Sequence, residues 1–112
     1  MKTKPTLKVA ALALLCVAAF TIRAAEPKEL WEKNCASCHG KDGKGETKMG
    51  KKAGVKDYTD PKVSETIKDD KAFKSVKEGM KEGGKELMKP FAEKLTDAEI
   101  KSLIAYMKTF KK

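Results

Sequence analysis

Five consecutive residues, Cys35-Ala36-Ser37-Cys38-His39, combine two thiols with an imidazole. Residues three positions apart lie on the same side of a helical turn, so both thiols can bond one flat cofactor along its edge. The histidine that follows can then ligate the cofactor's metal. C-x-x-C-H is typical of covalent c-type haem attachment, in which two thioethers form and the histidine binds iron. We therefore predict one haem c, attached through Cys35 and Cys38, with His39 as an axial iron ligand.

Two other kinds of site also use the C-x-x-C spacing. A closed zinc site needs two further Cys or His ligands, but after residue 24 the chain has no other cysteine, and His39 is its single histidine. A thioredoxin-like dithiol needs βαβ patterning around it, whereas the following segments indicate helices and glycine-rich loops. Haem is the favoured interpretation, and a thiol–disulfide oxidoreductase using Cys35 and Cys38 stays open as a weaker alternative.

A methionine thioether can fill the opposite axial position and raise the reduction potential of the iron. The candidates are Met49, Met80, Met88 and Met107. Met107 lies on the apolar face of a predicted helix, where methionine usually fills the core. Met88 lies in an irregular segment that Pro90 and Phe91 can hold across the distal haem face. We expect Met88 to be the ligand, and we keep Met80 or an open sixth site as alternatives.

The first 24 residues have the pattern of a secretory signal peptide. Three lysines precede an uncharged apolar stretch, residues 9–20, which is too short to span a membrane. We predict a leader at residues 1–24, cleaved after Ala24, and a single mature domain at residues 25–112. That domain keeps 21 basic and 16 acidic side chains, a net charge of +5. We expect a periplasmic monomer that has no membrane span after cleavage and binds no nucleic acid.

Apolar spacing and capping residues predict four helices in the mature domain, at about residues 27–38, 61–68, 69–78 and 97–109. The last has the clearest signal, because Thr96 and Glu99 form a capping box. Residues 40–58 and 80–89 are rich in glycine and charged residues, and we expect both to be irregular.

With these features the mature region resembles the class I bacterial cytochromes c, small monohaem proteins with His and Met iron ligands. Three segments carry the resemblance: residues 35–40, 88–91 and 95–106. It implies a small all-α fold of three to five helices around one covalently bound haem. It also implies that the first and last helices pack together, with Leu30 and Trp31 against Leu103, Ile104 or Tyr106.

The sequence departs from that family at two points. Lys89 separates Met88 from Pro90, although proline often follows the distal methionine directly. Many members also have a proline after the histidine, whose carbonyl accepts the imidazole proton, but residues 40–60 contain no proline. The acceptor for His39 is therefore not identified from the sequence.

Two axial protein ligands would leave no iron position open to a substrate. The resemblance then implies outer-sphere electron transfer, as in respiratory chains, and no enzymatic activity. If Met88 does not bind iron, a haem enzyme or gas sensor becomes the alternative. We also expect redox partners with acidic docking sites, which would meet lysines bordering the haem edge: Lys33, Lys41, Lys48, Lys85 and Lys89.

Overall fold

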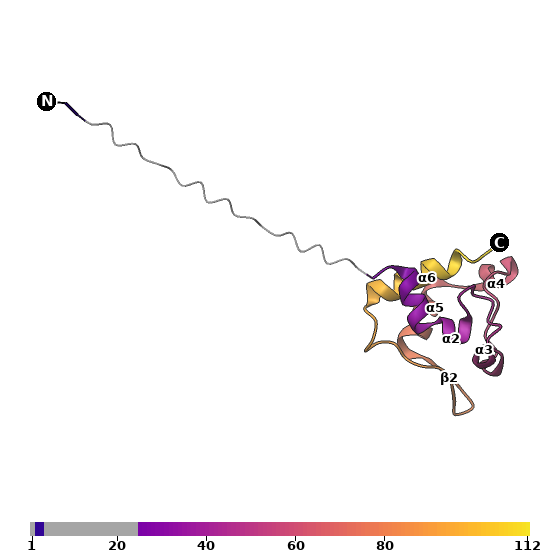
Figure 1. Cartoon of the computed structure of the whole chain (residues 1–112). Coiled ribbons are helices and arrows are strands. Elements are labelled where there is room, and N and C mark those ends of the chain that lie inside the picture. The colour runs from indigo at the N-terminus through magenta and orange to yellow at the C-terminus, as the bar shows by residue number, and fades with distance from the viewer. Residues whose placement is uncertain (1, 4–24) are drawn as a thin grey trace.

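The computed structural model describes residues 2–3 and 25–112, so nearly all of the leader predicted at residues 1–24 lies outside the described residues. The described chain forms a helical body with one short β-hairpin (Figure 1). In order, the elements are α1 (Pro27–Asn34), α2 (Ala36–His39), α3 (Lys48–Ala53), α4 (Pro61–Thr66), α5 (Asp69–Glu78), β1 (Met80–Glu82), β2 (Lys85–Met88) and α6 (Asp97–Lys108). The small helical fold is confirmed, but the described residues hold six helices rather than three to five. None of these helices combines the length and apolar character that a membrane crossing needs.

The predicted helix at residues 27–38 is divided at Cys35. The φ angle of Cys35 is −117°, far from the usual helical value of about −63°. The chain nevertheless keeps turning, because the Cys35 amide donates to the Trp31 carbonyl at 2.8 Å and the His39 amide donates to the Cys35 carbonyl at 2.9 Å. The whole C-x-x-C-H segment therefore occupies one turn at the end of α1.

The prediction of an irregular segment at residues 40–58 was wrong for residues 48–53, which form α3. Local capping explains this helix despite its polar sequence. The Thr47 hydroxyl accepts a hydrogen bond from the Gly50 amide at 2.9 Å, and Gly54 closes the C-terminus with a left-handed φ of 71°. The helix also packs against α2, so its support comes from the segment that carries the two thiols.

Helices α4 and α5 lie close to their predicted positions. Asp60 caps α4 by accepting a hydrogen bond from the Lys62 amide at 2.9 Å. The N-cap of α5 is Lys68, so Asp69 and Asp70 occupy the first turn, where their charges favour the helix dipole. Both helices lead the chain towards the hairpin and α6.

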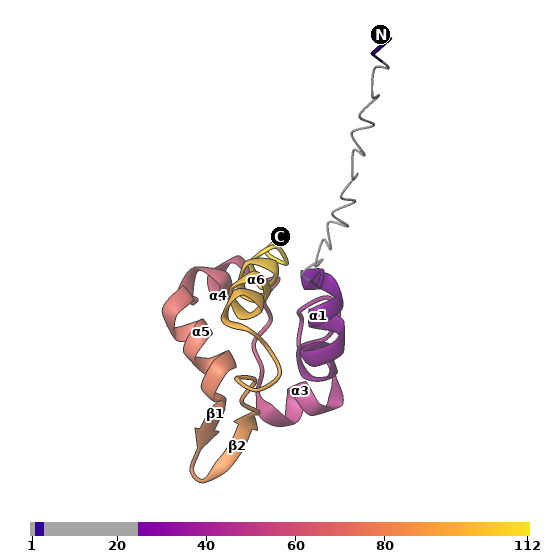
Figure 2. The ribbon, with the colours of Figure 1, turned by 90° about the vertical axis from the view of Figure 1, so that its left-hand side faces the viewer.

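Residues 80–89 were also predicted to be irregular, but most of them form the hairpin β1–β2. Gly83 and Gly84 both have positive φ angles, which a tight two-residue turn of this kind requires. Opposite charges face one another across the strands, in the pairs Lys81–Glu86 and Glu82–Lys85. No apolar alternation marks these strands in the sequence. The hairpin extends away from the helical body (Figure 2).

The core lies mainly where α1 meets α6, which confirms the predicted packing of the first and last helices. Its buried side chains are Leu30, Trp31, Cys35, Leu95, Ile100, Leu103, Ile104 and Met107. The Trp31 ring lies 6.0 Å from the Tyr106 ring and 5.1 Å from that of Phe110, measured between centroids. Helix α6 begins with the predicted Thr96–Glu99 capping box. This packing fixes α1, and through it the start of the C-x-x-C-H turn.

Candidate functional site

The two thiols lie on the turn between α1 and α2. Cys35 is buried in the core and Cys38 is half-buried, and both are free cysteines. Burial, followed by the neighbouring Cys38, raises the pKa of the Cys35 thiol to about 11. Redox-active dithiols need a lowered thiol pKa, so this environment disfavours the thiol–disulfide oxidoreductase.

Two aromatic rings lie close to the imidazole of His39. Tyr58 stacks on it with centroids 5.4 Å apart and planes inclined by 28°, and Trp31 lies 5.6 Å away at 43°. Burial lowers the pKa of His39, which favours the neutral ring. Neutral imidazole is the form that ligates metals.

The Nδ1 atom of His39 is buried and has no hydrogen-bond partner in the described part of the chain. Buried polar side-chain atoms are normally hydrogen-bonded. A purely structural role for this imidazole therefore does not explain why its Nδ1 atom has no partner. A ring with one uncommitted buried nitrogen is compatible with metal ligation, in which the second nitrogen is oriented by another group.

Three hydrogen bonds hold the end of the C-x-x-C-H turn. The last carbonyls of a helix have no partners within it, and here each is satisfied by a different neighbouring segment. The bonds are Trp31 Nε1 to Gly40 O at 2.8 Å, Gly45 N to His39 O at 2.8 Å, and Thr47 Oγ1 to Cys38 O at 2.6 Å. Helix α1, the following loop and the start of α3 therefore fix the backbone that carries Cys38 and His39.

Close approach of α3 depends on Gly50. A Cβ atom at this position would overlap the Cys38 carbonyl oxygen, and it would lie 2.8 Å from both the Gly45 carbonyl oxygen and Thr47 Oγ1. Only glycine lets the two backbones meet in this way.

The four candidate methionines have different surroundings. Met107 is 8% exposed and belongs to the core between α1 and α6, which agrees with its predicted core role. Met49, on α3, is 58% exposed, and Met80, on β1, is 47% exposed. Met88 is half-buried at the end of β2.

The chain beyond Met88 is tied to α5. The Phe91 amide donates to the Val76 carbonyl at 3.0 Å, and the Ala92 amide donates to the Lys77 carbonyl at 3.2 Å. Gly79 permits the contact, since a Cβ atom there would lie 2.6 Å from the Met88 carbonyl oxygen. These contacts hold the Met88 backbone at the end of α5.

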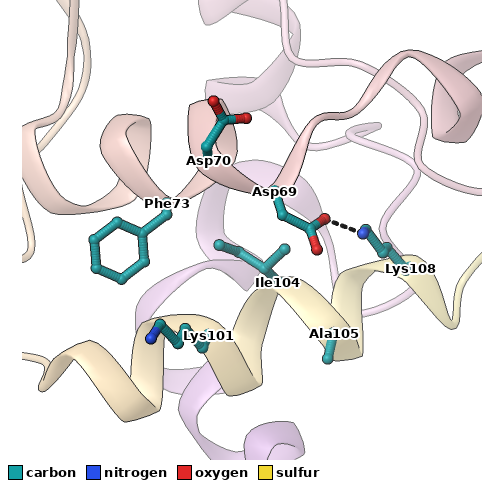
Figure 3. Close-up of a pocket in the computed structure, with 7 residues that line it drawn as sticks. All are labelled: Asp69, Asp70, Phe73, Lys101, Ile104, Ala105 and Lys108. Carbon is teal, nitrogen blue, oxygen red and sulfur yellow. Dashed lines mark hydrogen bonds and ion pairs between the residues drawn. The ribbon is translucent and has the colours of Figure 1, made fainter.

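A hollow of about 560 Å³ lies between α5 and α6 (Figure 3). Phe73 and Ile104 give it apolar walls, and an ion pair between Asp69 and Lys108 closes one end. Its lining includes no residue of the C-x-x-C-H turn and none of the four methionines. We therefore do not assign it to the haem site.

The chemistry of the donor set fits a c-type haem. Cys35 and Cys38 would form the thioethers, and His39 would ligate the iron. Half-buried apolar side chains next to the core could border the macrocycle: Tyr58, Ile67, Val76 and Phe91. Among residues 2–3 and 25–112, no three His, Cys, Asp or Glu side chains gather into another metal site.

Several contacts of the site were not found from the sequence. The stacking of Tyr58 on His39 depends on how residues 40–58 fold, and no local pattern indicates it. The Trp31 bond to Gly40 has a weak local signal, since Trp31 lies on the helix that leads into the motif. The roles of Thr47 and Gly50 had no signal once α3 was missed.

Comparison with known proteins finds related c-type cytochromes. Residues 23–107 match the family described as "Cytochrome C oxidase, cbb3-type, subunit III". A comparison with curated protein sequences finds no match. The solved structure of "KustC0563 c-type cytochrome" is similar, with a TM-score of 0.70 and 32% identity over 78% of this chain and 99% of that chain. The structure of a point mutant of Kustc0563 has a TM-score of 0.67 and 31% identity over 77% of this chain and 99% of that chain.

These matches cover the C-x-x-C-H turn, the core and α6 together. A domain of this family carries covalently bound haem c and serves haem-based electron transfer. The chain belongs to the family of cytochrome c domains described as "Cytochrome C oxidase, cbb3-type, subunit III", and its fold is that of a small class I-like c-type cytochrome.

Proposed function

We propose that this cytochrome is a periplasmic carrier of single electrons, with one haem c attached through Cys35 and Cys38 and with His39 and Met88 as axial ligands. The observation that carries the proposal is the imidazole of His39 directly after the two thiols, with a buried Nδ1 atom that has no hydrogen-bond partner in the described chain and with two aromatic neighbours. When bound, the haem supplies an iron that alternates between Fe(III) and Fe(II). With both axial positions occupied by the protein, electron transfer would be outer-sphere.

The residues around the histidine would keep its position unchanged during electron transfer. Trp31 and Tyr58 both lie close to the imidazole and would restrict its rotation. The three hydrogen bonds to the carbonyls of residues 38–40 hold the backbone beneath the ring. A site that moves little between the two oxidation states needs little reorganisation, which suits rapid electron transfer.

Met88 is the distal ligand that we propose. Its half-buried position and the fixed backbone that follows it favour Met88 over Met49, which is more than half exposed, and over Met107, which is committed to the core. A thioether opposite histidine donates weakly and raises the reduction potential.

Spectra of two alanine variants test this assignment. Met88→Ala should remove the far-red sulfur-to-iron charge-transfer band of the ferric protein and lower its reduction potential. Met80→Ala, on the facing strand, is the matched control and should change neither quantity appreciably. The opposite behaviour would assign the iron to Met80. A wild-type protein that is high-spin and binds carbon monoxide rapidly would instead favour the open-site enzyme or sensor.

Export and haem content belong to the same proposal. Residues 1–24 would direct the chain to the periplasm and be removed there, leaving residues 25–112 as a monomeric carrier. Intact mass spectrometry after acid–acetone treatment should find the mature chain from about Ala25 plus one covalent haem. Recovery of apoprotein, or of an uncleaved chain in the cytoplasm, would contradict it.

The docking surface that we propose is a rim of lysines around the haem edge. All five of its members are exposed: Lys33, Lys41, Lys48, Lys85 and Lys89. A cationic rim fits a redox partner with an acidic docking site, because complementary charge raises the rate of encounter and fixes orientation. The net charge of +5 expected for the mature chain has the same sign.

A further inference from the structure

The hairpin pairs two methionine residues across its strands. Met80 on β1 and Met88 on β2 are partners in the antiparallel register. In a regular antiparallel pair such residues have Cβ atoms roughly 4.5–5.5 Å apart, and here an irregularity in the register adjoins the pair, between Met80 and Lys81. Met80 is 47% exposed, whereas Met88 is half-buried and is the iron ligand in our proposed function. An accessible methionine is therefore the strand partner of the methionine assigned to the iron.

The half-buried residues of the strands, Leu87 and Met88, lie at the base of the hairpin. Every residue from Lys81 to Glu86 is exposed, so these residues bury little surface to stabilise the strands. An isolated two-stranded hairpin is only marginally stable in water. The register is irregular next to Met80, and Gly79 presses against the Met88 carbonyl. A polar oxygen added to the Met80 side chain therefore acts on the base of the strand that carries Met88.

We propose that Met80 is an oxidation site that controls ligation by Met88, an inference that rests on the proposed function. Hydrogen peroxide transfers one oxygen atom to the Met80 sulfur. A sulfur–oxygen bond forms from a sulfur lone pair, the peroxide O–O bond breaks and water leaves, so sulfur loses two electrons that peroxide gains. The sulfoxide is polar and disrupts apolar contacts. It draws the base of the hairpin into water and removes Met88 from the iron.

The other methionines make this response selective. Met107 is 8% exposed, so peroxide in solution reaches it poorly. Met49 is 58% exposed and will be oxidised at least as readily as Met80, but it lies on α3 and not in the hairpin. Met49 is therefore an internal control, since its oxidation should leave the Met88 ligand in place.

The test uses the mature ferric holoprotein and two variants, Met80→Leu and Met49→Leu. Each is treated with dilute hydrogen peroxide while the far-red sulfur-to-iron band is recorded, and the Soret band reports any loss of haem. Peptide mass spectrometry measures the sulfoxide at each methionine. The wild type and Met49→Leu should lose the far-red band in step with sulfoxide at Met80, and methionine sulfoxide reductase should restore it. Met80→Leu should keep the band at the same dose, although its Met49 is oxidised.

The outcomes separate this inference from the proposed function. An untreated protein without the far-red band would overturn the Met88 assignment and this inference with it. A band that is present but survives full conversion of Met80 to the sulfoxide would overturn the inference alone. Loss of the band from Met80→Leu at the wild-type rate would do the same.

Discussion

Replacing Gly50 by alanine tests whether α3 must contact the C-x-x-C-H turn. Gly50 lies inside α3 and has no left-handed backbone angle. Helix propensity alone therefore predicts that alanine stabilises the protein by about 0.5–1 kcal/mol. The structure predicts the opposite sign, because the new Cβ atom would overlap the Cys38 carbonyl oxygen and crowd Gly45 and Thr47.

The size of the loss follows from what α3 gives up when it withdraws from α2. Overpacking of a close contact costs about 1–3 kcal/mol. The Thr47 hydroxyl would also lose its 2.6 Å hydrogen bond to Cys38, a net change of about 0.5–1.5 kcal/mol. After the gain in helix propensity is subtracted, we expect the free energy of unfolding to fall by about 0.5–4 kcal/mol.

Guanidinium unfolding of the holoprotein measures this change, with Trp31 fluorescence and far-ultraviolet circular dichroism as two probes. Lys52→Ala is the matched control, since Lys52 is an exposed residue of the same helix. Its stability should stay within about 0.5 kcal/mol of the wild type. If Gly50→Ala proves as stable as the wild type, or more stable, the contact between α3 and Cys38 does not constrain the site.

Three further predictions concern the core, the loss of stability at acid pH and the lysine rim proposed for docking. Ile100 is 0% exposed, so Ile100→Ala should lower the free energy of unfolding by about 2–5 kcal/mol, and a melting temperature equal to that of the wild type would contradict the packing. The hydroxyl and amide of Thr59 donate to the Asp57 carboxylate and lower its pKa. The ionised Asp57 therefore stabilises the protein above the usual carboxyl pKa, and this stabilisation is lost as pH falls below about 4. Asp57→Asn should make the free energy of unfolding depend less on pH in this acid range, as urea titrations at successive pH values would show. Changing Lys85 and Lys89 together to glutamate should slow electron transfer to an acidic partner and weaken the dependence of the rate on salt. Electrostatic steering changes such rates by roughly 10–1,000-fold. A rate that the double change leaves unaltered would show that the lysine rim does not take part in docking.

Local signals in the sequence were enough to predict the first and last helices. Thr96 and Glu99 are close in sequence, and their capping box forms as predicted because it needs no other part of the chain. The packing of Trp31 against α6 followed from the family resemblance together with two apolar faces. The haem-attachment motif is likewise contiguous, so its residue types could be recognised without any fold.

Non-local support explains what was missed. Helix α3 has a polar sequence, and it is stable here because Gly50 rests on the Cys38 carbonyl and Thr47 bonds to it. The hairpin has no apolar alternation, and its register is set by the two-glycine turn and by tertiary contacts at Gly79. Neither support can be seen in a window of a few residues. The assignment of Met88 to the iron stays a prediction for the same reason, since it depends on where the hairpin lies relative to His39.

The site therefore has two parts. One consists of five adjacent residues, and the other is formed by residues distant in the sequence. Cys35, Cys38 and His39 are the residues to which we expect the haem to be attached. The surroundings of His39, by contrast, come from Trp31 before the motif and Tyr58 after it, and its Nδ1 atom lacks the proline carbonyl acceptor that many related proteins provide. The orientation of a ligating imidazole and the hydrogen bonds to its second nitrogen tune the metal. We therefore expect the packing of residues 40–58 around His39, and not the motif alone, to influence the reduction potential of this cytochrome.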